Sequence, residues 1–106
     1  MDWVYLDNNA TTQPLPEVVE AVDTATRELW ANPSSVHRMG QQVRQRIELA
    51  RQSVAELIGA KPRELIFTSG GTESDNLALF GVAPPEVLTL VTTRVEHAAV
   101  REPAQR

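Results

Sequence analysis

The chain has 106 residues, a net charge of −4, 42% hydrophobic and 23% charged residues, and no cysteine. These values are typical of one small globular domain, and they argue against a nucleic-acid surface, a disulfide framework and a thiolate metal site. No apolar run approaches the ~20 residues of a membrane span, and the start lacks a signal-peptide pattern, so we expect a cytoplasmic protein.

The amino-terminal third predicts an extended segment followed by a helix. Trp3-Val4-Tyr5-Leu6 is apolar and aromatic and predicts a strand or an extended arm. Residues 7–14 are rich in side chains that form turns, so a loop leading into a helix is expected there. The helix should stop before Asn32-Pro33, because a residue before proline is disfavoured in helical geometry. Its apolar face is formed by Leu15, Val18, Val19, Val22, Ala25 and Leu29.

The longest predicted helix runs from about Val36 to Ile58. The run Pro33-Ser34-Ser35 offers an N-cap, and Gly59 is placed as the C-terminal stop. Gly40 weakens the first turns and suggests close packing there. The polar face is either solvated surface or a partner site. The apolar face consists of Val36, Met39, Val43, Ile47, Ala50, Val54 and Leu57.

Two adjacent glycines connect the next two predicted elements. Residues 64–68 predict a short strand, and residues 76–80 predict the body of a helix, with Thr72 as its N-cap. Backbone N–H groups at such a helix start, with the hydroxyls of Ser69 and Thr72, suit a phosphate. The alternative is an ordinary strand-to-helix turn in which Thr72 only caps. Glu73 and Asp75 suit the helix dipole but would repel a nearby anion.

A second strand is predicted over Val87–Thr92, followed by a helix from Ala98 to Gln105 that Pro103 interrupts or kinks. Alternating strands and helices predict an α/β fold with a parallel sheet. In such sheets ligands gather at the carboxyl ends of strands, where residues 69–72 and 96–97 fall. This coincidence favours phosphate binding by the glycine turn.

Four motifs in this order resemble the opening quarter of a cysteine desulfurase of the nitrogen-fixation type, in the class V aminotransferase superfamily. They cover nearly the whole chain. Selenocysteine lyases and kynureninases share parts of the pattern. The motifs are Tyr5-Leu6-Asp7-Asn8-Asn9-Ala10-Thr11-Thr12, Asn32-Pro33-Ser34-Ser35 with His37 and Gly40, Phe67-Thr68-Ser69-Gly70-Gly71-Thr72-Glu73-Ser74-Asp75-Asn76, and Glu96-His97.

The resemblance implies a fold-type-I enzyme that depends on pyridoxal 5′-phosphate (PLP), a three-layer α/β/α fold that is incomplete in this chain. It implies that Gly71 and Thr72 hold the cofactor phosphate and that His97 lies over the pyridine ring and assists proton transfer. By itself, a histidine after a strand could equally be a capping or surface residue. The resemblance gives no role to Asn8, His37 or Arg38.

The same resemblance implies a homodimer that takes L-cysteine as substrate, yields L-alanine and an enzyme persulfide, and passes sulfur to an acceptor protein for iron–sulfur clusters. Residues 1–12 would form an N-terminal arm, part of the small domain in relatives. Residues 13–106 would begin the PLP-binding large domain. No metal ligands are expected.

Much of the family's machinery has no counterpart in this sequence. The Schiff-base lysine has none, because the single lysine, Lys61, precedes the glycine turn in another context, and no cysteine could carry a persulfide. We therefore expect an N-terminal fragment that is inactive alone and folds poorly alone. A selenocysteine-lyase-like enzyme, or a non-catalytic remnant that acts by binding, is the alternative.

Overall fold

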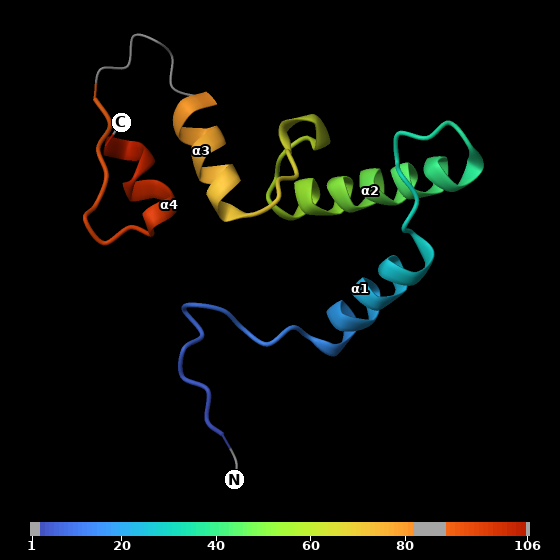
Figure 1. The fold of residues 1–106 in the computed structure, drawn as a ribbon, viewed down its shortest axis with the longest axis horizontal. Coiled ribbons are helices and arrows are strands. Elements are labelled where there is room, and N and C mark those ends of the chain that lie inside the picture. The colour runs from blue at the N-terminus through green and yellow to red at the C-terminus, as the bar shows by residue number, and fades with distance from the viewer. Residues whose placement is uncertain (1–2, 82–88, 106) are drawn as a thin grey trace. The chain divides into compact units, whose positions relative to one another are not determined.

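Every regular element that the structure describes is a helix. The structure is a computed structural model in which residues 3–81 and 89–105 are described (Figure 1). The chain divides into two units, Met1–Pro62 and Arg63–Arg106. The elements in order are α1 (Pro16–Glu28), α2 (Arg38–Leu57), the 3₁₀ turn η1 (Pro62–Glu64), α3 (Gly71–Gly81), α4 (Ala98–Arg101) and the 3₁₀ turn η2 (Pro103–Gln105).

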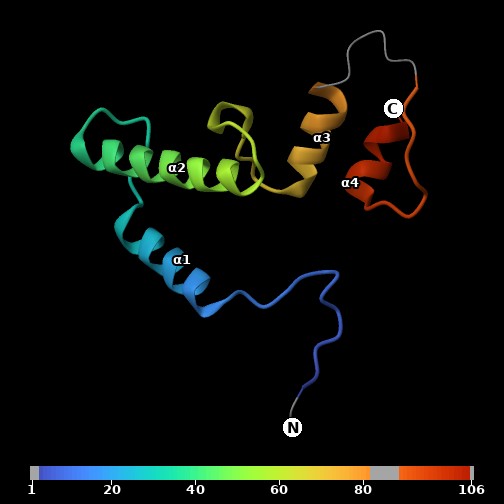
Figure 2. The same ribbon diagram turned by 180° about the vertical axis from the view of Figure 1, so that it is seen from behind.

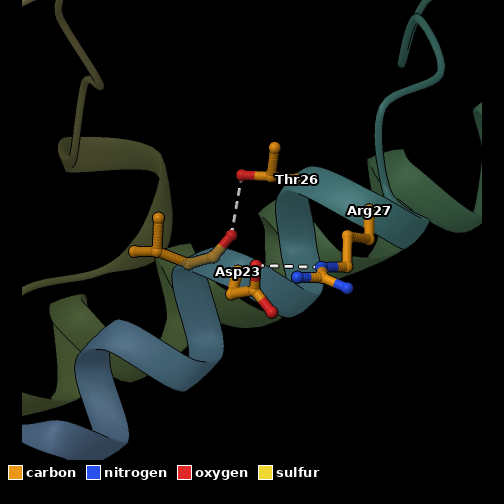
Figure 3. A network of polar contacts seen from close by, with 4 residues as sticks. Asp23, Thr26 and Arg27 are labelled. Carbon is orange, nitrogen blue, oxygen red and sulfur yellow. Dashed lines mark hydrogen bonds and ion pairs between the residues drawn. The ribbon is translucent and has the colours of Figure 1, made fainter.

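Helix α1 confirms the first predicted helix and its end before Asn32-Pro33. Pro16 occupies the first turn, where a missing N–H costs nothing, and the carbonyl of Leu15 starts the hydrogen-bonding pattern. On its polar side, Arg27 Nε donates to Asp23 Oδ1 at 2.9 Å (Figure 3). Such exposed pairs stabilise a helix only slightly. No residue of α1 is buried, so its apolar face has no cover among the described residues.

The start of α2 differs from the prediction that residues 33–35 provide its N-cap. The cap is His37, whose Nδ1 accepts a hydrogen bond from the backbone N–H of Gly40 at 3.3 Å. The serines lie in the preceding turn, where Ser34 N donates to Asn32 Oδ1 and Ser35 N donates to Asn32 O. Their own backbone is thereby held by Asn32, and the helix starts later than the serines suggested.

The loop before α2 curves back beside the helix (Figure 2), and Gly40 lies in the first turn of α2. It is buried, and a Cβ at this position would lie 2.6 Å from Ser35 O and 2.7 Å from Asn32 O. The loop is also tied to the helix by Arg44, whose Nε donates to Pro33 O at 2.9 Å. The prediction of close packing at Gly40 is therefore confirmed.

The carboxyl end of α2 confirms Gly59 as the helix stop. Gly59 has a φ of 68°, a left-handed conformation that glycine adopts without strain. The turn brings the N–H of Ala60 to the carbonyl of Ala55 at 2.8 Å. Ala55 is only 1% exposed. The sequence pattern had placed Ala50, which is exposed, on the apolar face instead.

No β-strand is formed among residues 3–81 and 89–105, so the predicted α/β fold is not confirmed by the structure. Residues 65–68 lead without regular structure from η1 to α3, and residues 89–92 are likewise irregular. Residues 87 and 88 of the second predicted strand lie outside the described residues. The physical reason is that an extended segment becomes a β-strand only when its backbone hydrogen-bonds to a neighbouring strand. In the described chain these segments have no such neighbour.

In the second unit, α3 packs against α4, and η2 also contacts α3; both views show α3 and α4 side by side (Figures 1 and 2). The predicted helix after residue 97 is confirmed, and Pro103 begins a separate 3₁₀ turn as expected. No helix among the described residues is long and apolar enough to cross a membrane.

The described residues bury mainly small apolar side chains and leave most of the large ones exposed or half-buried. Trp30 is 70% exposed, and Val18, Val19 and Val22 of α1 are 49–61% exposed. No large side chain among the described residues is fully buried. The apolar faces of α1 and α2 therefore remain available to a further layer. The buried hydrophobic residues are Ala31, Val43, Ala55 and Ala99.

We predict that Gly40→Ala destabilises the start of α2, because the new methyl group would overlap the carbonyl oxygens of Asn32 and Ser35. Overpacking of this kind costs about 1–3 kcal/mol. Helicity followed by circular dichroism during heating measures the effect. The matched control is Gly81→Ala, where the new Cβ would meet Leu77 Cδ1 at an ordinary 3.4 Å. An equal response of both variants would contradict the prediction.

Candidate functional site

The glycine turn leads into α3 two residues earlier than predicted. The helix begins at Gly71, and Ser74 N donates to Gly70 O at 3.1 Å, so Gly70 occupies the capping position. Thr72 therefore lies in the first turn of α3, and the prediction that it is the N-cap is wrong. Gly70 has no side chain to accept a backbone N–H of the first turn. Thr68 Oγ1 donates to Gly70 O at 3.1 Å and lies 2.6 Å from Ser74 Oγ, which ties residue 68 to the first turn of α3.

Glu73 provides the strongest contact across the turn. Its Oε2 accepts hydrogen bonds from Ser69 Oγ at 2.6 Å and from the backbone N–H of Ser69 at 2.7 Å. The Ser69 hydroxyl first, and its backbone N–H second, lower the pKa of Glu73 below the ordinary value of 4.5. The carboxylate is therefore charged at neutral pH and stabilises the positive end of α3.

The start of α3 retains unused hydrogen-bond donors. In the described part of the chain, no group accepts a bond from the backbone N–H of Gly71, Thr72 or Glu73. The hydroxyl of Thr72 has no partner there either. Free N–H groups at the positive end of a helix bind anions, and a hydroxyl adds another donor. The turn can therefore accept a phosphate, although the Ser69 hydroxyl is already engaged by Glu73.

His97 is the N-cap of the short helix α4. Its Nδ1 accepts a hydrogen bond from the backbone N–H of Ala99 at 3.1 Å. In the neutral ring this bond leaves the proton on Nε2. The ring is exposed, so Nε2 is the nitrogen that can exchange a proton with a bound molecule.

The structure brings Thr72 and His97 to one open cavity of about 350 Å³ between α3 and α4. Ser69 and Gly71 are not among its lining residues. Sequence reasoning missed Asn76, whose Nδ2 donates to Thr72 O at 2.8 Å. Its spacing of four residues from Thr72 on a helix was the signal that could have found it. The full lining is Thr72, Asn76, His97, Ala98, Ala99, Glu102 and Pro103.

The chemistry of these donors fits a phosphorylated aromatic cofactor. Thr72 offers a backbone N–H and a hydroxyl to an anion, and His97 offers a flat ring on the same cavity. The volume lies within the range of small-molecule sites. The carboxylate of Glu73 opposes an anion, but it is exposed to water, which weakens its field.

Other residues singled out in the sequence have local roles in the first unit. The hydroxyl of Tyr5 donates to Asp7 O at 2.8 Å and to Thr11 O at 3.1 Å, which shapes the turn-rich segment. His37 caps α2, and Lys61 directly precedes η1. Over residues 3–81 and 89–105, no cluster of histidine and carboxylate side chains could hold a metal ion.

Comparison with known proteins identifies a family over nearly the whole sequence. The profile described as "Aminotransferase class-V" matches residues 4–106. The chain is 48% identical over 102 residues to the cysteine desulfurase of Trichormus azollae, covering 94% of this chain and 26% of that protein. It is 50% identical to cysteine desulfurase NifS of Azotobacter vinelandii, covering 92% and 25%. The selenocysteine lyase of Xenopus tropicalis is 42% identical, covering 94% and 27%. The chain thus spans about a quarter of these relatives.

We predict that the turn between Ser69 and Glu73 loosens in acid. Because the pKa of Glu73 is lowered in the folded turn, its bonds stabilise the turn above the ordinary value of 4.5 and are lost as the pH falls through the folded value. Titration of the Glu73 carboxyl carbon by NMR measures this directly. In Ser69→Ala the midpoint should rise, since the hydroxyl is the main cause of the shift. An unchanged midpoint would contradict the assignment.

Proposed function

The chain belongs to the class V aminotransferase family, and we propose that it is the N-terminal segment of a PLP-dependent cysteine desulfurase. The complete enzyme would convert L-cysteine to L-alanine and retain the sulfur as a persulfide. Relatives named cysteine desulfurase, at 48% and 50% identity, support this activity. The chain itself has one lysine and no cysteine, so the lysine that binds PLP covalently and the persulfide cysteine would come from other parts of the enzyme.

The observation that carries the proposal is the meeting of Thr72 and His97 at one cavity. These residues are 25 positions apart in the sequence and belong to separate helices. We assign the cofactor phosphate to the N–H groups of Gly71 and Thr72 and to the Thr72 hydroxyl. This assignment uses donors that have no other partner in the described chain.

His97 would contribute a ring surface and a proton. PLP, when bound, supplies an electron sink for the carbon bearing the amino group. The imidazole would pack on the pyridine ring and exchange its proton at Nε2, because Nδ1 is held by Ala99 N–H. The backbone bond also fixes the ring's orientation before the cofactor enters.

We further propose that the complete enzyme has the three-layer α/β/α architecture of PLP enzymes of fold type I. Residues 1–12 would form an arm, and residues 13–106 would begin the PLP-binding domain. Residues 65–68 would join a mainly parallel sheet once neighbouring strands are present. The exposed apolar faces of α1 and α2 support such additional layers.

The proposed partners follow from the same family. The complete enzyme would act as a cytoplasmic homodimer and deliver sulfur to an iron–sulfur scaffold or another acceptor protein. The names IscS and NifS among the similar cysteine desulfurases agree with this assignment.

Selenocysteine is the second candidate substrate, because a selenocysteine lyase is 42% identical to this chain. Alanine release from L-cysteine and from L-selenocysteine by the complete enzyme would distinguish the two substrates. Release from neither would favour a non-catalytic chain that acts by binding.

We predict that Thr72→Ala in the complete enzyme weakens PLP retention. The substitution removes one donor to a charged oxygen, and such a bond is worth ~1.5–3 kcal/mol, or roughly ten- to a hundredfold in the dissociation constant. Equilibrium dialysis with absorbance detection of PLP measures it. Thr24→Ala, on the exposed surface of α1, is the matched control. Normal retention in the Thr72 variant would contradict the phosphate assignment.

We predict that His97→Ala leaves PLP bound but slows turnover, since a positioned proton-transfer group contributes typically ~10²–10⁴-fold. Alanine formation from L-cysteine gives kcat, and the cofactor's absorbance gives occupancy. His37→Ala is the matched control, because His37 also caps a helix through Nδ1. Full turnover in the His97 variant would refute the proposed role.

A further inference from the structure

The carboxylate of Glu73 reaches back across the two glycines of the turn to Ser69. One oxygen, Oε2, accepts from the Ser69 backbone N–H at 2.7 Å and from Ser69 Oγ at 2.6 Å. Short bonds to an ionised oxygen are of the stronger kind. They close a five-residue loop that contains Gly70 and Gly71. The N–H groups assigned above to the cofactor phosphate, those of Gly71 and Thr72, lie within this loop.

The glycines themselves do little to fix the loop. Neither Gly70 nor Gly71 has a positive φ, and a Cβ built at either would meet no atom within 4 Å. The carbonyl of Gly70 is held by Ser74 N at 3.1 Å. On the other side of the glycines, the Ser69 amide is held only by Glu73 in the described chain. Thr68 Oγ1 also bonds Gly70 O and Ser74 Oγ, but the Glu73 carboxylate is the group that ties Ser69 to α3 in the described chain.

We propose that Glu73 is a positioning residue for the glycine turn, residues 69–73. Its bonds to Ser69 hold the loop closed, so that the N–H groups of Gly71 and Thr72 are already arranged when a phosphate arrives. The proposal rests on the proposed function, because it takes these donors to be the ones that hold the PLP phosphate. Preorganisation of this kind lowers the ordering cost of binding.

The negative charge of Glu73 has an opposite effect, because it repels a phosphate. The side chain is exposed, and water and salt weaken the interaction between separated exposed charges. The hydrogen bonds act at contact distance and are weakened less. We therefore expect the positioning effect to exceed the repulsion.

Two substitutions separate the hydrogen bonds from the charge. Glu73→Gln keeps an acceptor oxygen and removes the charge, whereas Glu73→Ala removes both. Asp75→Asn and Asp75→Ala are the matched controls, since Asp75 carries the same charge on α3 but accepts no bond from Ser69 in the described chain. The complete enzyme is titrated with PLP, and the ¹H–¹⁵N signals of Ser69, Gly71 and Thr72 are followed by selective labelling.

Without PLP, the Ser69 amide proton should move upfield in Glu73→Ala and stay near its original position in Glu73→Gln. The PLP dissociation constant, from the Gly71 and Thr72 signals, should rise roughly tenfold in Glu73→Ala. In Glu73→Gln it should stay within about threefold, since the lost bond strength and the lost repulsion oppose each other. The Asp75 variants should leave the Ser69 signal in place.

Three results would overturn the proposal. The first is an unchanged Ser69 signal in Glu73→Ala, and the second is tighter PLP binding by that variant. The third is an equal loss of affinity in Glu73→Ala and Asp75→Ala. If PLP moves neither Gly71 nor Thr72 in the unsubstituted complete enzyme, the cofactor assignment itself fails. The Ser69 signal, measured without PLP, distinguishes that failure from an error about Glu73.

Discussion

The packing of α3 against α4 joins the two parts of the candidate cofactor site. Thr72 and the free N–H groups belong to α3, whereas His97 caps α4, so neither helix alone could present both an anion site and an imidazole. Ala99 takes part both in the packing and in the site: its side chain is buried, and its backbone N–H donates to His97 Nδ1.

The described chain buries little apolar surface, and this limits how firmly its helices are held together. The buried residues of the described chain are small, and large side chains such as Trp30 remain open. Small buried side chains stabilise a helix pair only weakly, because the hydrophobic effect scales with the apolar area removed from water. The small side chain of Ala99 is buried in the second unit, so the packing of α3 on α4 around the cavity is held by little buried apolar area in the described chain.

The sequence predicted the helices well because their determinants are local. The apolar periodicity of α1 and α2 and the positive φ of Gly59 all lie within a few residues of the features they define. The cap of α2 was missed because a histidine can replace serine as an acceptor, and Ser34 and Ser35 were already held by Asn32.

The predicted strand at residues 65–68 was not formed, because a strand needs distant partner strands, and the sequence of these residues does not specify those partners. The sequence predicted only that residues 69–72 and 96–97 would lie at the same edge of a sheet. It did not predict that Asn76 and Glu102 would line the cavity.

The two histidines show which observation bears on function. Both accept a backbone N–H through Nδ1 at the start of a helix, His37 from Gly40 and His97 from Ala99. The capping bond therefore cannot distinguish a structural histidine from a reactive one, because the local geometry is the same. The difference lies in the surroundings of the ring: His97 lines the cavity that contains Thr72, and His37 is not among the residues lining it. A proton-transfer role needs a bound molecule within reach of the free nitrogen, so the role proposed for His97 rests on the shared cavity and not on the residue type.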